Sequence, residues 1–178
     1  DKTRFFTEIN EDFAKYKMGI AWLLTARGIP QLYYGNEILM KGASNPDGWV
    51  RLDFQGGWKE DKQNKFTEAG RTAQENEAFN YVKAFANFRK NSSAIKTGKF
   101  MQYVPVDGVY VYFRYDENQT VMCIMNTTEN SAALNLSRFN ERINGFTKAY
   151  DVATGNTFNL DNTLTIGAKY LLVLDLKK

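Results

Sequence analysis

The stretch Arg27-Gly-Ile-Pro-Gln-Leu-Tyr-Tyr-Gly-Asn-Glu37 decides how the rest of this 178-residue chain is interpreted. Gly28 can adopt the left-handed conformation that ends a helix, and Pro30 prevents that helix from continuing. The compact apolar run 29–34 is typical of a strand that is buried on both faces of a parallel sheet. Glu37 follows just past its carboxyl end, which in a (β/α) barrel is the active face.

A helix is predicted on each side of this stretch. Residues 11–26 place apolar side chains at helical spacing, with Asn10 as the expected N-cap, and residues 74–90 do the same. Between them, residues 38–73 are rich in Gly and polar residues. A connection of this length is usually functional or disordered, and its aromatic side chains (Trp49, Phe54 and Trp58) favour an ordered binding loop.

After Gly98 the apolar period changes from helical to two, which predicts an antiparallel sandwich or barrel. Asp107-Gly108 is a hairpin turn signal between two of the strands. The chain therefore divides near Lys96, and one strand with two helices cannot close a barrel alone. The predicted strands cover residues 100–104, 109–115, 120–126, 132–136, 145–152, 157–160, 163–166 and 170–176.

Composition excludes several classes of function. The net charge of +3 is too small and dispersed to indicate nucleic-acid or membrane binding. The chain contains no histidine, which excludes a histidine base or a His-rich metal site within it. Its one cysteine, Cys123, lies in an apolar run and is expected to be a buried, inert thiol. No phosphate loop or metal-binding motif is present, so neither a cofactor nor a metal is expected.

The motif Gly-x-Pro-x-x-Tyr-Tyr-Gly-x-Glu over residues 28–37 resembles the eighth barrel strand of the α-amylase family of glycoside hydrolases. The neopullulanases and cyclomaltodextrinases of starch-utilisation systems look nearest. The resemblance implies an α+β fragment: the last βα units of a (β/α)₈ TIM barrel over residues 1–96, then an antiparallel β-sandwich, domain C, over residues 97–178. It further implies the C-terminal part of a retaining hydrolase of maltodextrin, pullulan or cyclodextrin.

Asp1-Lys-Thr-Arg4-Phe5 resembles the tail of the family motif Asn-His-Asp-x-x-Arg-Phe. By that resemblance Asp1 is the third catalytic carboxylate, which stabilises an oxocarbenium-like transition state, and Arg4 is its neighbour at the substrate site. The alternative is a frayed terminal residue. The family's nucleophile and general acid lie upstream, and a retaining glycosidase needs both carboxylates, about 5 Å apart. The chain by itself is therefore expected to be inactive without the missing barrel portion.

Asn45-Pro46-Asp47 followed by Arg51 resembles the family loop after the eighth strand. The resemblance implies that Asp47 and Arg51 hold glucose units, and carboxylate acceptors with guanidinium donors suit sugar hydroxyls. The alternative is a surface ion pair. Trp49, Tyr34 and Trp58 are candidate stacking platforms, although general aromatic burial favours packing for each of them. Glu37 is either scaffold or sugar contact.

The rival hypothesis is a non-catalytic β-sandwich, either carbohydrate-binding or purely structural. A binding module should expose two or more aromatic side chains on one sandwich face, whereas a domain C should bury them or turn them toward the barrel. An α-glucan oligosaccharide is the expected ligand, and oligomer formation stays open. By resemblance alone, the protein is expected in the periplasm. No signal peptide is found at the start of the chain, but the first residue is not Met, so the missing signal peptide says nothing about the compartment.

Overall fold

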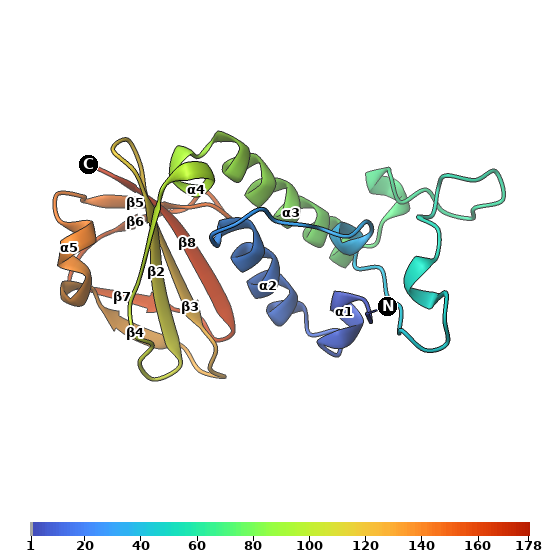
Figure 1. The fold of residues 1–178 in the computed structure, drawn as a ribbon, viewed down its shortest axis with the longest axis horizontal. Coiled ribbons are helices and arrows are strands. Elements are labelled where there is room, and N and C mark those ends of the chain that lie inside the picture. The colour runs from blue at the N-terminus through green and yellow to red at the C-terminus, as the bar shows by residue number, and fades with distance from the viewer. Residues whose placement is uncertain (1) are drawn as a thin grey trace. The chain divides into compact units, whose positions relative to one another are not determined.

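The computed structural model describes residues 2–178, which form two compact units (Figure 1). The first unit comprises the described residues up to Lys17 together with Ile29–Lys83. The second comprises Met18–Gly28 and Ala84–Lys178. The predicted domain boundary between residues 96 and 97 stays a prediction.

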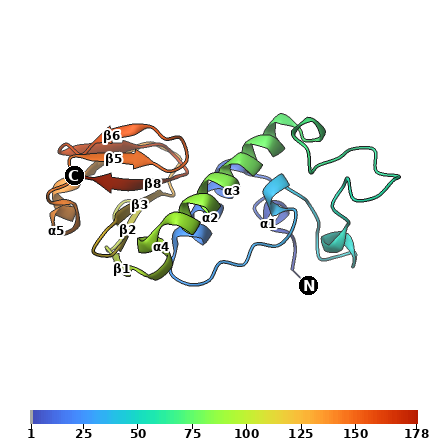
Figure 2. The ribbon, with the colours of Figure 1, turned by 90° about the horizontal axis from the view of Figure 1, so that it is seen from above.

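The second unit is built on a six-stranded antiparallel sheet with the strand order β1-β2-β3-β8-β5-β6. A separate antiparallel pair, β4 and β7, forms a second sheet. Figure 2 shows β5, β6 and β8 side by side, in agreement with their pairing. The strands are β1 (Lys99–Gln102), β2 (Val109–Tyr115), β3 (Thr120–Asn126), β4 (Ala132–Asn135), β5 (Lys148–Asp151), β6 (Thr157–Asn159), β7 (Thr163–Ile166) and β8 (Tyr170–Lys177).

The hydrophobic core of this unit contains apolar side chains from both sheets, as in a β-sandwich. Every second residue of β2, beginning with Val109, faces this core, and β3 and β8 follow the same alternation. The short 3₁₀ turn η4 (Leu136–Phe139) and helix α5 (Asn140–Ile143) add Leu136, Phe139 and Ile143 to it. The predicted antiparallel sandwich is therefore confirmed.

The central strands are buried on their second face as well. Tyr112, Cys123 and Val173 stand in one row across β2, β3 and β8, each at most 1% exposed. The Thr25 hydroxyl, at the end of α2 (Phe13–Thr25), donates to the Ala21 carbonyl at 2.6 Å. Its single hydrogen is thereby used, so the Tyr112 hydroxyl donates to Thr25 Oγ1 at 2.5 Å. Burial raises the pKa of the Cys123 thiol to about 12, as expected for an inert thiol.

Two arginines satisfy the carbonyl groups at the end of α2. Arg114, which is 2% exposed, donates from Nη1 to the carbonyls of Thr25 (3.3 Å) and Ala26 (3.0 Å). Its Nη2 donates to the Gly98 carbonyl at 3.2 Å, beyond the short helix α4 (Ser93–Thr97). Arg89 donates to the carbonyls at 24 and 28. Cations at a helix C-terminus are favourable because the last carbonyl groups lack partners within the helix.

The hairpin between β1 and β2 turns at Asp107 and Gly108, with φ angles of 48° and 76°. Positive φ at both positions defines the turn that suits the twist of a two-residue hairpin. A Cβ on Gly108 would also lie 2.4 Å from Thr128 Cγ2, so this position needs glycine for its backbone and for space. The predicted Asp-Gly hairpin is confirmed.

The first unit contains helix α1 (Phe5–Glu8), the start of α2, and most of α3 (Ala73–Asn91). Three short 3₁₀ turns lie between α2 and α3, namely η1 (Asn36–Ile38), η2 (Trp49–Arg51) and η3 (Glu68–Gly70). Tyr16 is fully buried among Phe5, Phe6 and Phe13, with ring centroids 5.7–6.1 Å away. No helix among residues 2–178 is long and apolar enough to cross a bilayer.

The predicted buried strand 29–34 is wrong. These residues form no strand, and Ile29, Tyr33 and Tyr34 are 98%, 45% and 40% exposed. A strand exists only through hydrogen bonds to a neighbouring strand, and the described residues pair none with this segment. The TIM-barrel βα units predicted for residues 1–96 are thus not seen. The expected N-cap is also wrong: Asn10 has φ 56°, while Asp12 Oδ1 accepts from the amides of Ala14 and Lys15.

We expect Arg114→Met to lower the free energy of unfolding by about 2–4 kcal/mol, because one buried and two partly buried carbonyl groups lose a charged donor. Arg138→Met is the matched control, since the exposed Arg138 side chain donates to a single carbonyl, that of Val104. Urea denaturation followed by circular dichroism measures both. Equal, small losses in the two variants would contradict the role of Arg114.

Candidate functional site

The sequence-predicted site residues, apart from Asp1, all lie in the first unit. Asp1 lies outside the described residues, so its catalytic role stays a prediction. The others are Arg4, Tyr34, Glu37, Asp47, Trp49 and Arg51, with Trp58 further along the same loop.

Arg4 lies at the centre of this region and is 3% exposed. Its amide donates to the Gly42 carbonyl at 2.8 Å, and its Nη1 donates to the Tyr34 carbonyl at 2.7 Å. The guanidinium carbon lies 4.8 Å from the ring centroid of Tyr33 and 4.7 Å from that of Tyr34, within the range of cation–π attraction. Arg4 thereby joins residues that are about thirty positions apart in the chain.

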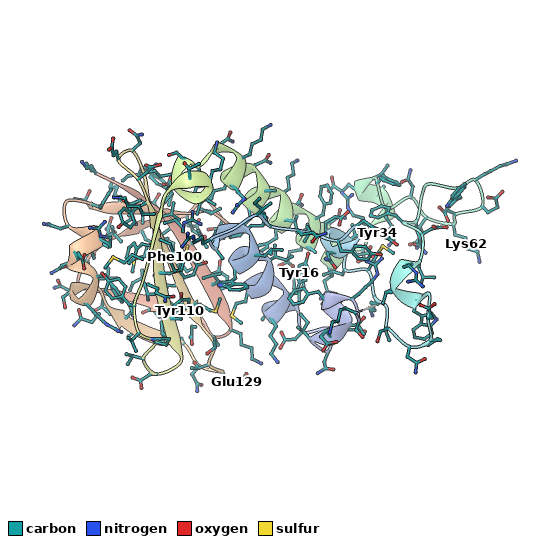
Figure 3. The ribbon with its side chains drawn as sticks, in the orientation of Figure 1. Tyr16, Tyr34, Lys62, Phe100, Tyr110 and Glu129 are labelled. Carbon is teal, nitrogen blue, oxygen red and sulfur yellow. The ribbon has the colours of Figure 1, made fainter. Side chains whose placement is uncertain are left out.

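The backbone after Tyr34 turns sharply because Gly35 has a φ of 79°. A Cβ at Gly35 would meet Met40 Sδ at 2.1 Å, and the Met40 amide donates to the Gly35 carbonyl at 2.8 Å. This turn carries Glu37 on η1. Burial, followed by the negative charge of Glu37, raises the pKa of Tyr16, whose hydroxyl donates to the Asn36 carbonyl at 2.8 Å. Figure 3 labels Tyr16 and Tyr34.

Asp47 and Arg51 form the ion pair that their spacing allows. Arg51 Nη2 lies 2.6 Å from Asp47 Oδ1, and the two side chains are 50% and 79% exposed. An exposed pair of this kind adds only about 0–1 kcal/mol to stability. The geometry fits the surface ion pair and the sugar site equally, and the role stays a prediction.

The aromatic candidates differ in their surroundings. Trp49 and Trp58 are 54% and 64% exposed. The Tyr34 hydroxyl donates to the Leu52 carbonyl at 2.9 Å, which ties it to the loop. The amides of Gly56 and Trp58 donate to Asp61, and these bonds, that of Trp58 foremost, lower the pKa of its carboxyl group. The loop is therefore ordered by its own hydrogen bonds, as predicted.

An open pocket with a volume of about 340 Å³ lies within this unit. It brings together Arg4 and Arg51, while Tyr34, Glu37, Asp47, Trp49 and Trp58 do not line it. The other lining residues could not be predicted from the sequence. Residues 2–5 lie near residues 33 and 50 only because the chain packs in this way, and no local pattern indicates that contact. The pocket lining comprises Lys2, Thr3, Arg4, Phe5, Tyr33, Asn36, Val50 and Arg51. Within residues 2–178 no three His, Cys, Asp or Glu side chains gather as a metal site.

A capping box that sequence reasoning also missed anchors the end of the loop. The Thr72 amide donates to Glu75 Oε2 at 2.7 Å, and the Glu75 amide donates to Thr72 Oγ1 at 3.2 Å. The spacing Thr-x-x-Glu was the available signal. Lys65 Nζ, whose side chain is 8% exposed, also donates to Glu75 Oε2 at 2.6 Å. Burial would raise the pKa of Glu75, but the bonds from Lys65 and Thr72 lower it on balance.

We expect Glu75→Gln to lower the free energy of unfolding by about 1–3 kcal/mol at pH 7, since it leaves Lys65 buried without a counter-charge. The folded-state pKa of Glu75 lies below its ordinary value of 4.5, so this stabilisation is present above that value. It is lost as the pH falls through the folded pKa. The difference between wild type and variant should therefore shrink below about pH 4, measured by urea denaturation at several pH values.

Glu77→Gln is the control on the same helix, because Glu77 is 56% exposed and paired with Lys17 on the surface. It should change stability by under about 0.5 kcal/mol. An undiminished difference for Glu75→Gln at pH 3 would contradict the linkage.

Known proteins resemble this chain both in its sandwich and in the residues before it. Residues 100–175 match the family described as the cyclo-malto-dextrinase C-terminal domain. A cyclomaltodextrinase from Thermoanaerobacter pseudethanolicus is 26% identical over 137 residues, which are 77% of this chain and 21% of that protein. A cyclomaltodextrinase from Geobacillus thermopakistaniensis is 31% identical over 136 residues, which are 75% of this chain and 21% of that protein.

Among solved structures, an α-amylase from Geobacillus thermoleovorans, complexed with acarbose, has the same fold with a TM-score of 0.74. It is 22% identical, and the match covers 99% of this chain and 37% of that chain. The chain thus spans about a fifth of the length of the curated relatives it matches.

Proposed function

We propose a function from one premise, that the chain belongs to the α-amylase family of glycoside hydrolases. On that premise it is the C-terminal part of a retaining, neopullulanase-like enzyme of starch utilisation that hydrolyses maltodextrin, pullulan or cyclodextrin. The observation that supports this best is the match of residues 100–175 to the cyclo-malto-dextrinase C-terminal domain. The relatives' names include cyclomaltodextrinase, which agrees with an α-glucan substrate.

In this proposal the sugar is held by hydrogen bonds that suit hydroxyl groups. Asp47 accepts from two sugar hydroxyls, and the planar guanidinium of Arg51 donates in fixed geometry. Trp49, 54% exposed within η2, offers an apolar face for a pyranose ring. Asp1 supplies the negative charge that stabilises the oxocarbenium-like transition state, while the nucleophile and acid come from other parts of the enzyme. The proposed compartment is the periplasm.

The alternative of a carbohydrate-binding sandwich has less support. Among the aromatic side chains of residues 97–178, Tyr150 alone belongs to the exposed class, at 41%. A binding face needs a larger platform, since stacking on several sugars uses several rings. Apart from Trp22, the other exposed aromatic side chains lie within residues 33–66, in the loop region of the first unit.

We expect the 178-residue chain to release no reducing sugar from maltoheptaose, β-cyclodextrin or pullulan, because the two carboxylates that a retaining glycosidase requires are not matched in it. A reducing-sugar assay on protein freed of contaminating amylase measures this. Turnover that persists through purification and disappears in Asp1→Asn would contradict the proposal.

We expect maltotriose to bind the chain weakly and to shift the backbone amide signals of residues 47–51 in nuclear magnetic resonance spectra. Asp47→Asn or Arg51→Met should weaken this binding at least about fivefold, since each removes charge-assisted bonds to sugar hydroxyls. Lys41→Met is the matched control: it breaks the equally exposed pair with Glu11 and should leave the affinity within about twofold. Shifts confined to residues 97–178 would instead favour the binding-module alternative.

A further inference from the structure

The buried guanidinium of Arg4 uses only part of its hydrogen-bonding capacity. Nη1 donates to the Tyr34 carbonyl, but Nε and Nη2 are buried and have no partner among residues 2–178. A buried, charged donor without an acceptor is strongly unfavourable, and native proteins rarely retain one. Arg114 and Arg142 each leave Nε alone in this state, whereas Arg4 leaves two adjacent donors, and this pair indicates an acceptor outside the described residues.

The two unpartnered atoms lie on one edge of the planar guanidinium. On that edge the Nε–H and Nη2–H bonds run parallel, at a spacing that matches the two oxygens of a carboxylate. The third nitrogen, Nη1, is held by the Tyr34 carbonyl, and the rings of Tyr33 and Tyr34 fix the group from the side. Both atoms are covered by neighbouring groups in this conformation, so a carboxylate reaches them only after those neighbours move aside.

The pocket around Arg4 carries positive charge. Lys2 and Arg51 also line it, and none of its described lining residues is acidic. Its volume of about 340 Å³ admits a small molecule or one side chain. A neutral diol could occupy the same edge of the guanidinium, but it would leave the buried charge uncompensated, whereas a carboxylate would neutralise it.

We propose that Arg4 binds a carboxylate group side-on, through Nε and Nη2, in the pocket that it shares with Lys2 and Arg51. The carboxylate belongs either to a small ligand or to a side chain of another polypeptide, for example a second copy of this chain. The chemistry of recognition is the same in both cases. The pocket shares Arg51 with the proposed sugar site, whereas Asp47 does not line it.

The test is a titration of the ¹⁵N-labelled chain with formate, the smallest carboxylate, followed at the Arg4 Nε–H signal. We expect a saturable downfield shift with a dissociation constant on the order of 1–30 mM, typical of a single charge-assisted contact. Chloride at equal ionic strength should bind at least about tenfold more weakly, because a single acceptor atom bends both hydrogen bonds that the two oxygens of a carboxylate accept in line. The absence of a saturable shift with formate, or an equal response to chloride, would overturn the proposal.

Arg4→Lys keeps the charge but removes the paired donors. Formate affinity, read from the amides of Tyr33 and Asn36, should fall at least about tenfold. Lys41→Met, an exposed change in the same unit, should leave the affinity within about twofold. Equal affinity in wild type and Arg4→Lys would contradict side-on binding. Both variants are compared by their amide spectra to establish that they are folded, and the wild-type titration depends on neither.

The source of the carboxylate is distinguished by protein concentration. If a second copy supplies it, the Arg4 Nε–H signal moves on dilution without formate, and formate competes with that change. If a small ligand supplies it, the signal is independent of protein concentration until formate is added. Because the readout is a resonance and not hydrolysis, the proposal can fail while the proposed enzyme function stands.

Discussion

The sandwich unit depends on the burial of its central strands from both sides. Strands β2, β3 and β8 send alternate residues into the core between the sheets, and the residues between them are buried too. Arg114 stands on that second face, where a charged side chain is stable only if its donors find acceptors. The carbonyls at the end of α2 and after α4 are those acceptors. These contacts pair both terminal nitrogens of the Arg114 guanidinium, while its buried Nε has no partner among the described residues. They also give hydrogen bonds to carbonyl groups that the end of α2 leaves open.

Much of this unit was predictable from sequence because the apolar alternation of a half-buried strand is local. β2, β3 and β7 lie at the predicted residues, and Asp107-Gly108 specified its turn through positive φ at both positions. The strand expected at 29–34 failed because strand formation requires a hydrogen-bonding neighbour, which no local pattern contains. The turn η4 and helix α5 were missed because they are too short to show a period.

The sequence predicted contacts in the candidate site only where two residues lie at a fixed, short separation in the chain. Asp47 and Arg51, four residues apart, form the ion pair that such a spacing permits. The environment of Arg4 was not predictable, since it depends on two tyrosines about thirty residues away and on the turn at Gly35 that orients them. The two regions also differ chemically. The pair at 47 and 51 is exposed and suits hydroxyl groups, while Arg4 is buried and requires a negative charge.

We propose that this chain is the C-terminal part of a glycosidase whose nucleophile and general acid lie upstream in its sequence. The most direct measurement is the nucleotide sequence upstream of the codon for Asp1. The account predicts an open frame that encodes Asn-His directly before Asp1, with one strand bearing an Asp and another bearing a Glu further upstream. An initiation codon at or next to the Asp1 codon would contradict the claim.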